Sequence, residues 1–139
     1  FHSSVLPASE QEMGWKIGDL SFEMQISRKI PQVIHEFLPK FIQDNYKEVI
    51  DHASTEWAIH PGGRRILNAC MEGLNLAPEK MKISYEVLNR FGNMSSPTVL
   101  FVLKEMLYGT GSDSCAYPVI ALAFGPGLTV ESAKLQYHA

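Results

Sequence analysis

Cysteine is scarce in this chain of 139 residues, which contains only Cys70 and Cys115. Two cysteines are too few for a disulfide scaffold, and the sequence has no Cys-x-x-Cys pair or His/Cys cluster of the kind that binds zinc. This low cysteine content is typical of a protein in a reducing compartment. We therefore expect neither a disulfide framework nor a metal site.

Basic blocks and long apolar runs are also missing. The 12 Lys and Arg residues oppose 15 Asp and Glu, giving a formal net charge of -3, and no run of cations could neutralise a series of phosphates. No window approaches the roughly 20 apolar residues of a membrane-spanning helix, and the start of the chain lacks a signal-peptide layout. We expect no nucleic acid or membrane partner and a cytoplasmic location. Because the chain begins with Phe1 rather than Met, we also expect it to be a piece of a longer protein.

The sequence does have the composition of a compact domain, with 45% apolar and 19% charged residues. Alternating apolar residues from Leu20 to Ile26 predict a half-buried strand. Helical spacing then predicts a helix from Pro31 to about Val49, which Pro39 should kink or split.

The second half of the chain predicts strands and helices that interleave. The expected elements are a strand at 57–59 with a helix at 66–74, helices at 83–90 and 98–108, and strands at 119–124 and 128–135. The helix at 98–108 is apolar on nearly every side, which is typical of a buried, central helix. The predicted class is α/β, a mixed sheet packed with helices.

His60 ends an apolar segment and precedes Pro61, Gly62 and Gly63. Small residues let a ligand approach the backbone closely, so this position suits a side chain that acts on a substrate. The alternative is a histidine that merely caps the turn, and the spacing leaves both interpretations open.

Asn93 follows a glycine and precedes two serines at the start of the most apolar helix. Its amide could be a fixed hydrogen-bond donor of the oxyanion-hole kind. Composition alone favours the alternative, in which Asn93 and Ser95 satisfy backbone amides at the helix start. The Gly-Pro-Gly at 125–127 could be a simple turn, or it could place Phe124 and Pro126 beside the same cleft and shape an apolar pocket.

The remaining candidates for chemistry favour plainer roles. Cys70 lies on the apolar side of its helix, so we expect a small buried hydrophobe rather than a nucleophile, and Cys115 is interpreted as incidental. The other histidines stand in polar or terminal contexts and are expected to be solvated: His2, His35, His52 and His138.

Three segments, in this order, resemble one known family: Trp57–Gly63, Phe91–Ser96 and Phe124–Glu131. They are similar to the C-terminal half of type III polyketide synthases, the chalcone synthase-like branch of the thiolase superfamily. The similarity extends over nearly the whole chain, because residues 13–15 and 27–31 resemble bacterial members. The resemblance implies that residues 1–139 form the C-terminal domain of a longer enzyme, half of a five-layered αβαβα fold.

The family uses a Cys-His-Asn triad, and the resemblance assigns His60 and Asn93 to two of its members. The cysteine belongs to the N-terminal half, so this chain alone is expected to be inactive. The implied full-length enzyme is an acyltransferase that condenses an acyl-CoA starter with malonyl-CoA and needs no cofactor beyond these coenzyme A thioesters. The implied partners are the N-terminal half and a second copy in a homodimer.

The resemblance also implies residues that shape the substrate site. Gly62 and Gly63 would border the pantetheine arm, Ser95 would line the pocket, and Phe124 and Pro126 would line the cleft. The family's second gatekeeper phenylalanine falls at Phe22 or at Met24, and we assign Met24 to the substrate-binding set. Ala123 and Pro97 depart from the family pattern and are expected to reshape the tunnel slightly.

Two alternatives stay open at this stage. A ketoacyl synthase III shares the triad and fold and takes its substrate from an acyl carrier protein, but normally has His-Gln-Ala-Asn where this chain has His60-Pro61-Gly62-Gly63. A non-catalytic scaffold would keep His60 and Asn93 only as relics. For the isolated domain, we expect an exposed apolar face and either association, seen as a concentration-dependent mass in solution, or marginal stability.

Overall fold

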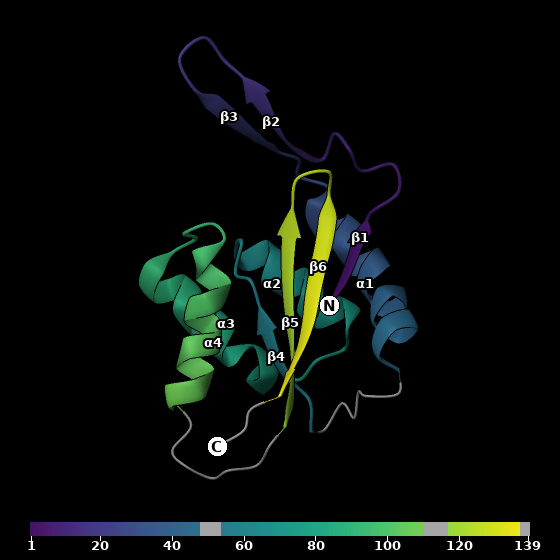
Figure 1. Ribbon diagram of the computed structural model, residues 1–139, viewed down its shortest axis with the longest axis vertical. Coiled ribbons are helices and arrows are strands. Elements are labelled where there is room, and N and C mark those ends of the chain that lie inside the picture. The colour runs from purple at the N-terminus through teal and green to yellow at the C-terminus, as the bar shows by residue number, and fades with distance from the viewer. Residues whose placement is uncertain (48–53, 110–116, 137–139) are drawn as a thin grey trace.

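The computed structural model describes residues 1–47, 54–109 and 117–136 (Figure 1). The strands are β1 (His2–Val5), β2 (Met13–Ile17), β3 (Phe22–Ile26), β4 (Glu56–Ile59), β5 (Pro118–Gly125) and β6 (Thr129–Gln136). The helices are α1 (Ile30–Tyr46), α2 (Arg64–Gly73), α3 (Pro78–Phe91) and α4 (Pro97–Gly109).

Four strands form a mixed sheet in the order β1-β6-β5-β4. Strand β4 runs parallel to β5, whereas β5–β6 and β1–β6 are antiparallel pairs. Strands β2 and β3 form a separate antiparallel hairpin, which projects beyond one end of the sheet (Figure 1). The predicted α/β class with a mixed sheet is confirmed.

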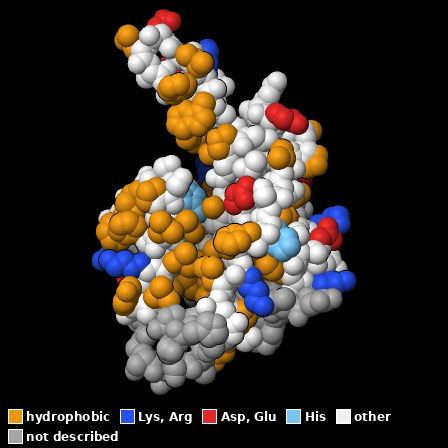
Figure 2. Space-filling view, viewed as in Figure 1, with side chains coloured by type: hydrophobic (Ala, Val, Ile, Leu, Met, Phe, Trp, Pro, Cys, Tyr) orange, Lys and Arg blue, Asp and Glu red, His pale blue; other side chains and the backbone are white. Residues whose placement is uncertain are grey.

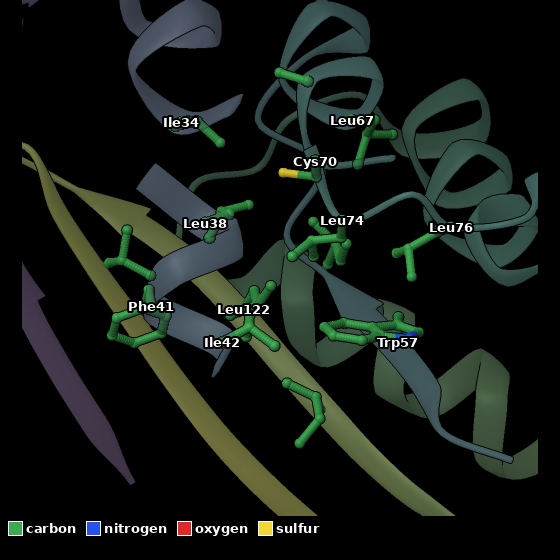
Figure 3. Close-up of a cluster of buried hydrophobic side chains, with 14 of the residues drawn as sticks. Ile34, Leu38, Phe41, Ile42, Trp57, Leu67, Cys70, Leu74, Leu76 and Leu122 are labelled. Atoms are coloured by element: carbon green, nitrogen blue, oxygen red, sulfur yellow. The ribbon is translucent and has the colours of Figure 1, made fainter. Parts of the chain in front are cut away.

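Alternation along β4 divides the core between the two faces of the sheet. Trp57 and Ile59 join the large cluster formed with α1 and α2, in which Leu38, Leu67 and other apolar side chains interdigitate (Figure 3). Ala58, between them, faces the opposite way and packs with Val87 of α3 and Val102 of α4. The parity of a residue in β4 therefore decides which helical layer it meets.

Helix α1 continues through Pro39, so the expected split does not occur, and the alternative, a kink at Pro39, stays a prediction. A proline leaves the carbonyl four residues earlier, that of His35, without its helical hydrogen bond. This backbone lies close against Gly73 at the end of α2, where an added Cβ would be 2.8 Å from the His35 oxygen. Close packing between α1 and α2 thus occurs where the helical ladder is interrupted.

The strand predicted around Phe22 exists as β3, but the prediction that it is half-buried is wrong. All five of its residues are exposed, including Phe22 and Met24. The reason is that β3 pairs only with β2 and that the described elements form no layer over this hairpin.

Helix α4 is buried on one face within this chain, not on all sides as expected. Thr98 and Val102 are fully buried, whereas Leu100 is 62% exposed and Tyr108 is 82% exposed. Among the described elements, α3 and the adjoining strands cover one side of α4 and leave its other apolar side open. Figure 2 shows hydrophobic side chains gathered over the hairpin and over the α3–α4 side of the molecule. The expected exposure of an apolar face is therefore confirmed, and association stays a prediction.

Other boundaries follow the predicted pattern with local differences. Helix α3 begins at Pro78, earlier than the predicted 83, because proline is well suited to the first helical turn. Strands β5 and β6 lie close to their predicted ranges, whereas β1 and β2 were not predicted at all.

Candidate active site

His60 is held at the carboxyl end of β4 by the sheet itself. Its backbone N–H donates to the carbonyl of Leu122 at 2.8 Å, which continues the β4–β5 ladder by one residue. Two residues after Ala58, it shares the face of the sheet that meets α3 and α4. The side chain is only 9% exposed, so the fold positions the imidazole with little freedom.

One edge of the His60 ring is buried, and the other adjoins a glycine. Nδ1 is buried and has no hydrogen-bond partner among the described residues, and burial lowers the pKa of the imidazole below its ordinary value. A Cβ built on Gly62 would lie 3.6 Å from Cδ2 and 3.7 Å from Nε2, so the absent side chain leaves this edge uncovered. A neutral imidazole carries one N–H, and Nε2 can donate it when Nδ1 is unprotonated.

The side-chain amide of Asn93 is fixed at both ends. Its Oδ1 accepts the backbone N–H of Ser95 at 2.9 Å, and its Nδ2 donates to the carbonyl of Gly62 at 3.1 Å. These two partners together specify which atom is oxygen and which is nitrogen. Because the amide has two N–H donors and the residue is exposed, one donor stays available to a ligand.

The loop that carries Asn93 is supported by a buried hydroxyl. Thr98 Oγ1 accepts the N–H of Met94 at 2.8 Å and donates to the carbonyl of Ser95 at 2.7 Å. Ser95 itself adopts a φ of 64°, a left-handed conformation unusual for a residue with a side chain. Thr98 is not among the residues predicted from the sequence; the signal for it is a hydroxyl in the first turn of a helix, three residues after a serine.

The helices on either side of this loop are fastened to each other. The rings of Phe91 and Phe101 meet edge to face with centroids 5.1 Å apart. Arg90 lies over the Phe91 ring and pairs with Glu105 of α4 at 3.4 Å. The two ends of the Asn93 loop are consequently held at a defined separation.

The structure brings some of the predicted substrate-binding residues to His60 and Asn93 and leaves others apart. Gly62 and Gly63 lie in the loop after His60, and Ser95 contacts Asn93. Phe124 instead packs against the large core cluster, on the face of the sheet opposite His60. Phe124 alternates with the same phase as Ile120 and Leu122 along β5, so its side chain lies on the same face of the sheet as theirs.

Pro126 follows β5, which runs parallel to β4, and Met24 is on the hairpin that projects beyond the sheet, so both lie toward the end that carries His60. Within the described ranges, no hydrogen bond or ion pair joins either residue to His60. Pro126 is exposed in the β5–β6 turn, and Met24 is exposed on the projecting hairpin. The turn is tied to the hairpin by a hydrogen bond of 2.8 Å from the Gly127 N–H to the carbonyl of Met13. Their roles in substrate binding stay predictions.

Cys70 is a buried, free thiol in the large cluster, among leucine and isoleucine side chains, as predicted (Figure 3). Burial raises its pKa, which removes the thiolate that a nucleophile needs. His2 and His35 are exposed as expected. Cys115, His52 and His138 lie outside the described residues.

The described part of the chain has neither a cluster of metal-binding side chains nor a membrane-spanning helix. No three His, Cys, Asp or Glu side chains come together as a metal site within residues 1–47, 54–109 and 117–136. In the same ranges, no helix combines the length and apolar character required to cross a membrane.

The mixed α/β fold, with His60 and Asn93 near one end of its sheet, is of the thiolase-like class, as its match to solved structures shows. Residues 2–137 match the family of chalcone and stilbene synthases, C-terminal domain, and the chain belongs to this family. The family resemblance seen in the three motifs is thereby confirmed.

Solved structures show the same fold. A point mutant of CsyB superposes with a TM-score of 0.88 at 22% identity, over 99% of this chain and 39% of that chain. PKS-I from the brown alga Ectocarpus siliculosus gives a TM-score of 0.83 at 28% identity, over 99% of this chain and 38% of that chain. This chain therefore spans well under half the length of both proteins.

Proposed function

We propose that this chain is the C-terminal half of a type III polyketide synthase and supplies two of its three catalytic side chains, His60 and Asn93. The observation that carries the proposal is the hydrogen bond from Asn93 Nδ2 to the carbonyl of Gly62, the residue at which an added Cβ would lie 3.7 Å from Nε2 of His60. Two N–H donors from separate elements are thus held beside one loop. The nucleophilic cysteine is proposed to come from an N-terminal half.

In the proposed reaction, an acyl group passes from a coenzyme A thioester to that cysteine, and coenzyme A leaves as the thiol. Malonyl-CoA then binds, and its thioester carbonyl oxygen accepts hydrogen bonds from His60 Nε2 and Asn93 Nδ2. Loss of carbon dioxide leaves an enolate whose negative charge these donors stabilise, each by about 3–4 kcal/mol. The enolate carbon attacks the acyl group and releases the cysteine thiolate.

The protonation state of His60 fits this role. Burial lowers the pKa of the imidazole, so the ring is neutral near pH 7 and can donate from Nε2. A neutral donor stabilises a developing oxyanion without first transferring its proton to solvent. The full-length enzyme is further proposed to be a cytoplasmic homodimer that uses coenzyme A thioesters directly and needs no cofactor or metal.

The test uses the full-length protein, with intact mass recorded after incubation with a panel of acyl-CoA thioesters. We expect a covalent acyl adduct that forms normally in Asn93→Ala and slowly in His60→Ala. Malonyl-CoA decarboxylation should fall by orders of magnitude in both variants and stay unchanged in the control His35→Ala, which alters an exposed histidine.

Other outcomes separate the alternatives. An adduct formed only from acyl carrier protein thioesters would replace this proposal with a ketoacyl synthase III-like reaction. No adduct from either donor would replace it with a non-catalytic scaffold.

A further inference from the structure

Thr98 connects an exposed loop to the interior of the domain. It stands in the first turn of α4, five residues after Asn93, and its side chain is fully buried. Asn93, Ser95 and Pro97, in the loop before it, are all exposed. Val102, one turn further along α4, belongs to the buried cluster between this helix and the sheet. The Thr98 side chain is therefore a fixed point beside a loop that has little packing of its own.

The Thr98 hydroxyl binds two peptide groups of this loop. It accepts the N–H of Met94 at 2.8 Å, which belongs to the peptide group between Asn93 and Met94. It donates to the Ser95 carbonyl at 2.7 Å, in the peptide group between Ser95 and Ser96. The peptide group between these two carries the Ser95 N–H, which donates to Asn93 Oδ1 at 2.9 Å. One hydroxyl thus holds the peptide groups on both sides of the one that binds the Asn93 amide.

The backbone of Ser95 depends on this support. Its φ of 64° lies in the left-handed region, which is unfavourable for a residue with a side chain and persists only where the surroundings maintain it. The Ser95 carbonyl accepts both the backbone N–H of Thr98 at 3.0 Å and the Thr98 hydroxyl. Without the hydroxyl, we expect the loop to adopt other conformations, in which the Ser95 N–H no longer faces Asn93 Oδ1.

The direction of the free Asn93 N–H follows from the two bonds that the amide already makes. Oδ1 is held by Ser95, and one Nδ2 hydrogen is held by the Gly62 carbonyl at 3.1 Å. A primary amide is planar, so these two bonds together set the direction of its second Nδ2 hydrogen. If the bond to Ser95 is lost, the amide can rotate about the bond to Gly62, and the second hydrogen loses its direction.

His60 is positioned by a different part of the fold. Its backbone N–H bonds the carbonyl of Leu122 in β5, and its ring is buried beside Gly62. In the proposed reaction, formation of the acyl adduct uses His60, whereas decarboxylation uses both His60 and Asn93. A defect in the Asn93 loop should therefore slow decarboxylation and spare adduct formation.

We propose that Thr98 is a positioning residue for the decarboxylation step, which acts through the orientation of Asn93 and does not touch the substrate. This inference rests on the proposed function, which gives the second Nδ2 hydrogen its role. Because the oriented donor stabilises charge that develops only in the transition state, loss of the Thr98 hydroxyl should lower kcat and leave KM nearly unchanged.

The experiment measures two rates in the full-length protein: formation of the acyl adduct, by intact mass, and decarboxylation of malonyl-CoA. For Thr98→Val, we expect the kcat of decarboxylation to fall about tenfold or more, because a small misplacement of a donor is costly, while the rate of adduct formation stays that of the wild type. Each decarboxylation rate is divided by the amount of enzyme that forms the adduct, so partial unfolding of a variant does not change the comparison.

Two further variants isolate the hydroxyl. Thr98→Ser restores it and should recover most of the kcat. Thr55→Val is the matched control, since Thr55 is equally buried but its hydroxyl has no hydrogen-bond partner among the described residues. We expect Thr55→Val to decarboxylate malonyl-CoA as the wild type does.

The double variant Thr98→Val/Asn93→Ala tests whether the two residues act together. It should decarboxylate no more slowly than Asn93→Ala, because no amide is left to orient. The inference is overturned if the two losses multiply, if Thr98→Val keeps the wild-type kcat, if it slows both rates equally, or if Thr55→Val loses as much. The proposed function fails instead if Asn93→Ala itself decarboxylates malonyl-CoA at the wild-type rate.

Discussion

The amide nitrogen of Asn93 lies 3.1 Å from the carbonyl oxygen of Gly62, although 31 positions separate the two residues. This hydrogen bond joins the loop after β4 to the loop before α4. It fixes the position of one donor relative to the backbone that carries the other, His60. The geometry of the pair is therefore set by the main chain of Gly62 rather than by contact between the two side chains that are proposed to be catalytic.

Gly62 is expected to matter for access and not for folding. In Gly62→Ala, the new methyl would lie 3.6–3.8 Å from His60 and Ile66, which is ordinary contact and should leave the melting temperature unchanged. The same methyl would cover the Nε2 edge of His60, so we expect the rate of malonyl-CoA decarboxylation by the full-length protein to fall on the order of 10- to 100-fold. Gly14→Ala in β2 is the control, since its Cβ meets nothing within 4 Å and it has no predicted role in the site. Equal activity of the two variants would contradict this prediction.

Thr98 is expected to control the order of the Asn93 loop. Thr98→Val keeps the shape of a fully buried side chain but removes the hydroxyl that bonds Met94 and Ser95. We expect a loss of about 1–3 kcal/mol in the free energy of unfolding, because the Met94 amide loses its partner and the Ser95 carbonyl keeps only the backbone N–H of Thr98. Urea denaturation measures this loss. Thr98→Ser retains the hydroxyl, so its free energy of unfolding should decrease clearly less than that of Thr98→Val.

The burial of His60 predicts a pH dependence of stability. Because the folded-state pKa lies below the ordinary value of 6.5, the unfolded chain binds more protons between the two values. The contribution of His60 to the free energy of unfolding is fully present above about pH 6.5 and decreases as the pH falls toward the lowered pKa. His60→Gln should flatten this part of the profile of unfolding free energy against pH. A profile that flattens equally in His35→Gln, which changes an exposed side chain, would refute the assignment to His60.

Gly73 is expected to set the distance between α1 and α2. An alanine in a helix usually adds stability over glycine, by about 0.5–1 kcal/mol. In Gly73→Ala the new Cβ would be 2.8 Å from the backbone oxygen of His35, which cannot rotate away, so we expect a net loss of about 1–3 kcal/mol. Gly14→Ala, where nothing lies within 4 Å, serves as the control. The comparison is made by thermal or urea unfolding.

The β4–loop–α2 unit was predictable because its signals are local. An apolar strand, His60-Pro61-Gly62-Gly63 and an amphipathic helix follow one another without interruption, and the structure places β4 and α2 accordingly. Strand β1 had no such signal. It exists through pairing with β6, where Ser3 contacts Glu131 across a separation of 128 positions, and a single-sequence pattern does not report such a partner.

The placement of Phe124 shows a different reason for failure. Its nearness in sequence to the Gly-Pro-Gly turn suggested a place in the cleft, but the pleat of β5 directs it with Leu122 into the core. The apolar residues around Met24 and in α4 have the spacing of buried elements, yet many of them are exposed. Burial there depends on surfaces that the described residues do not supply, and hydrophobic periodicity carries no information about where such cover comes from.

The alternation of side chains along β4 also limits how the length of this segment can vary. Trp57 must meet the α1–α2 layer and Ala58 the α3–α4 layer. His60 lies on the α3–α4 face because it follows Ala58 by two residues. Inserting or deleting one residue between Trp57 and His60 would turn the imidazole away from Asn93 while leaving every amino acid of the motif in place. In homologous sequences, this interval should therefore tolerate substitution far better than a change of length.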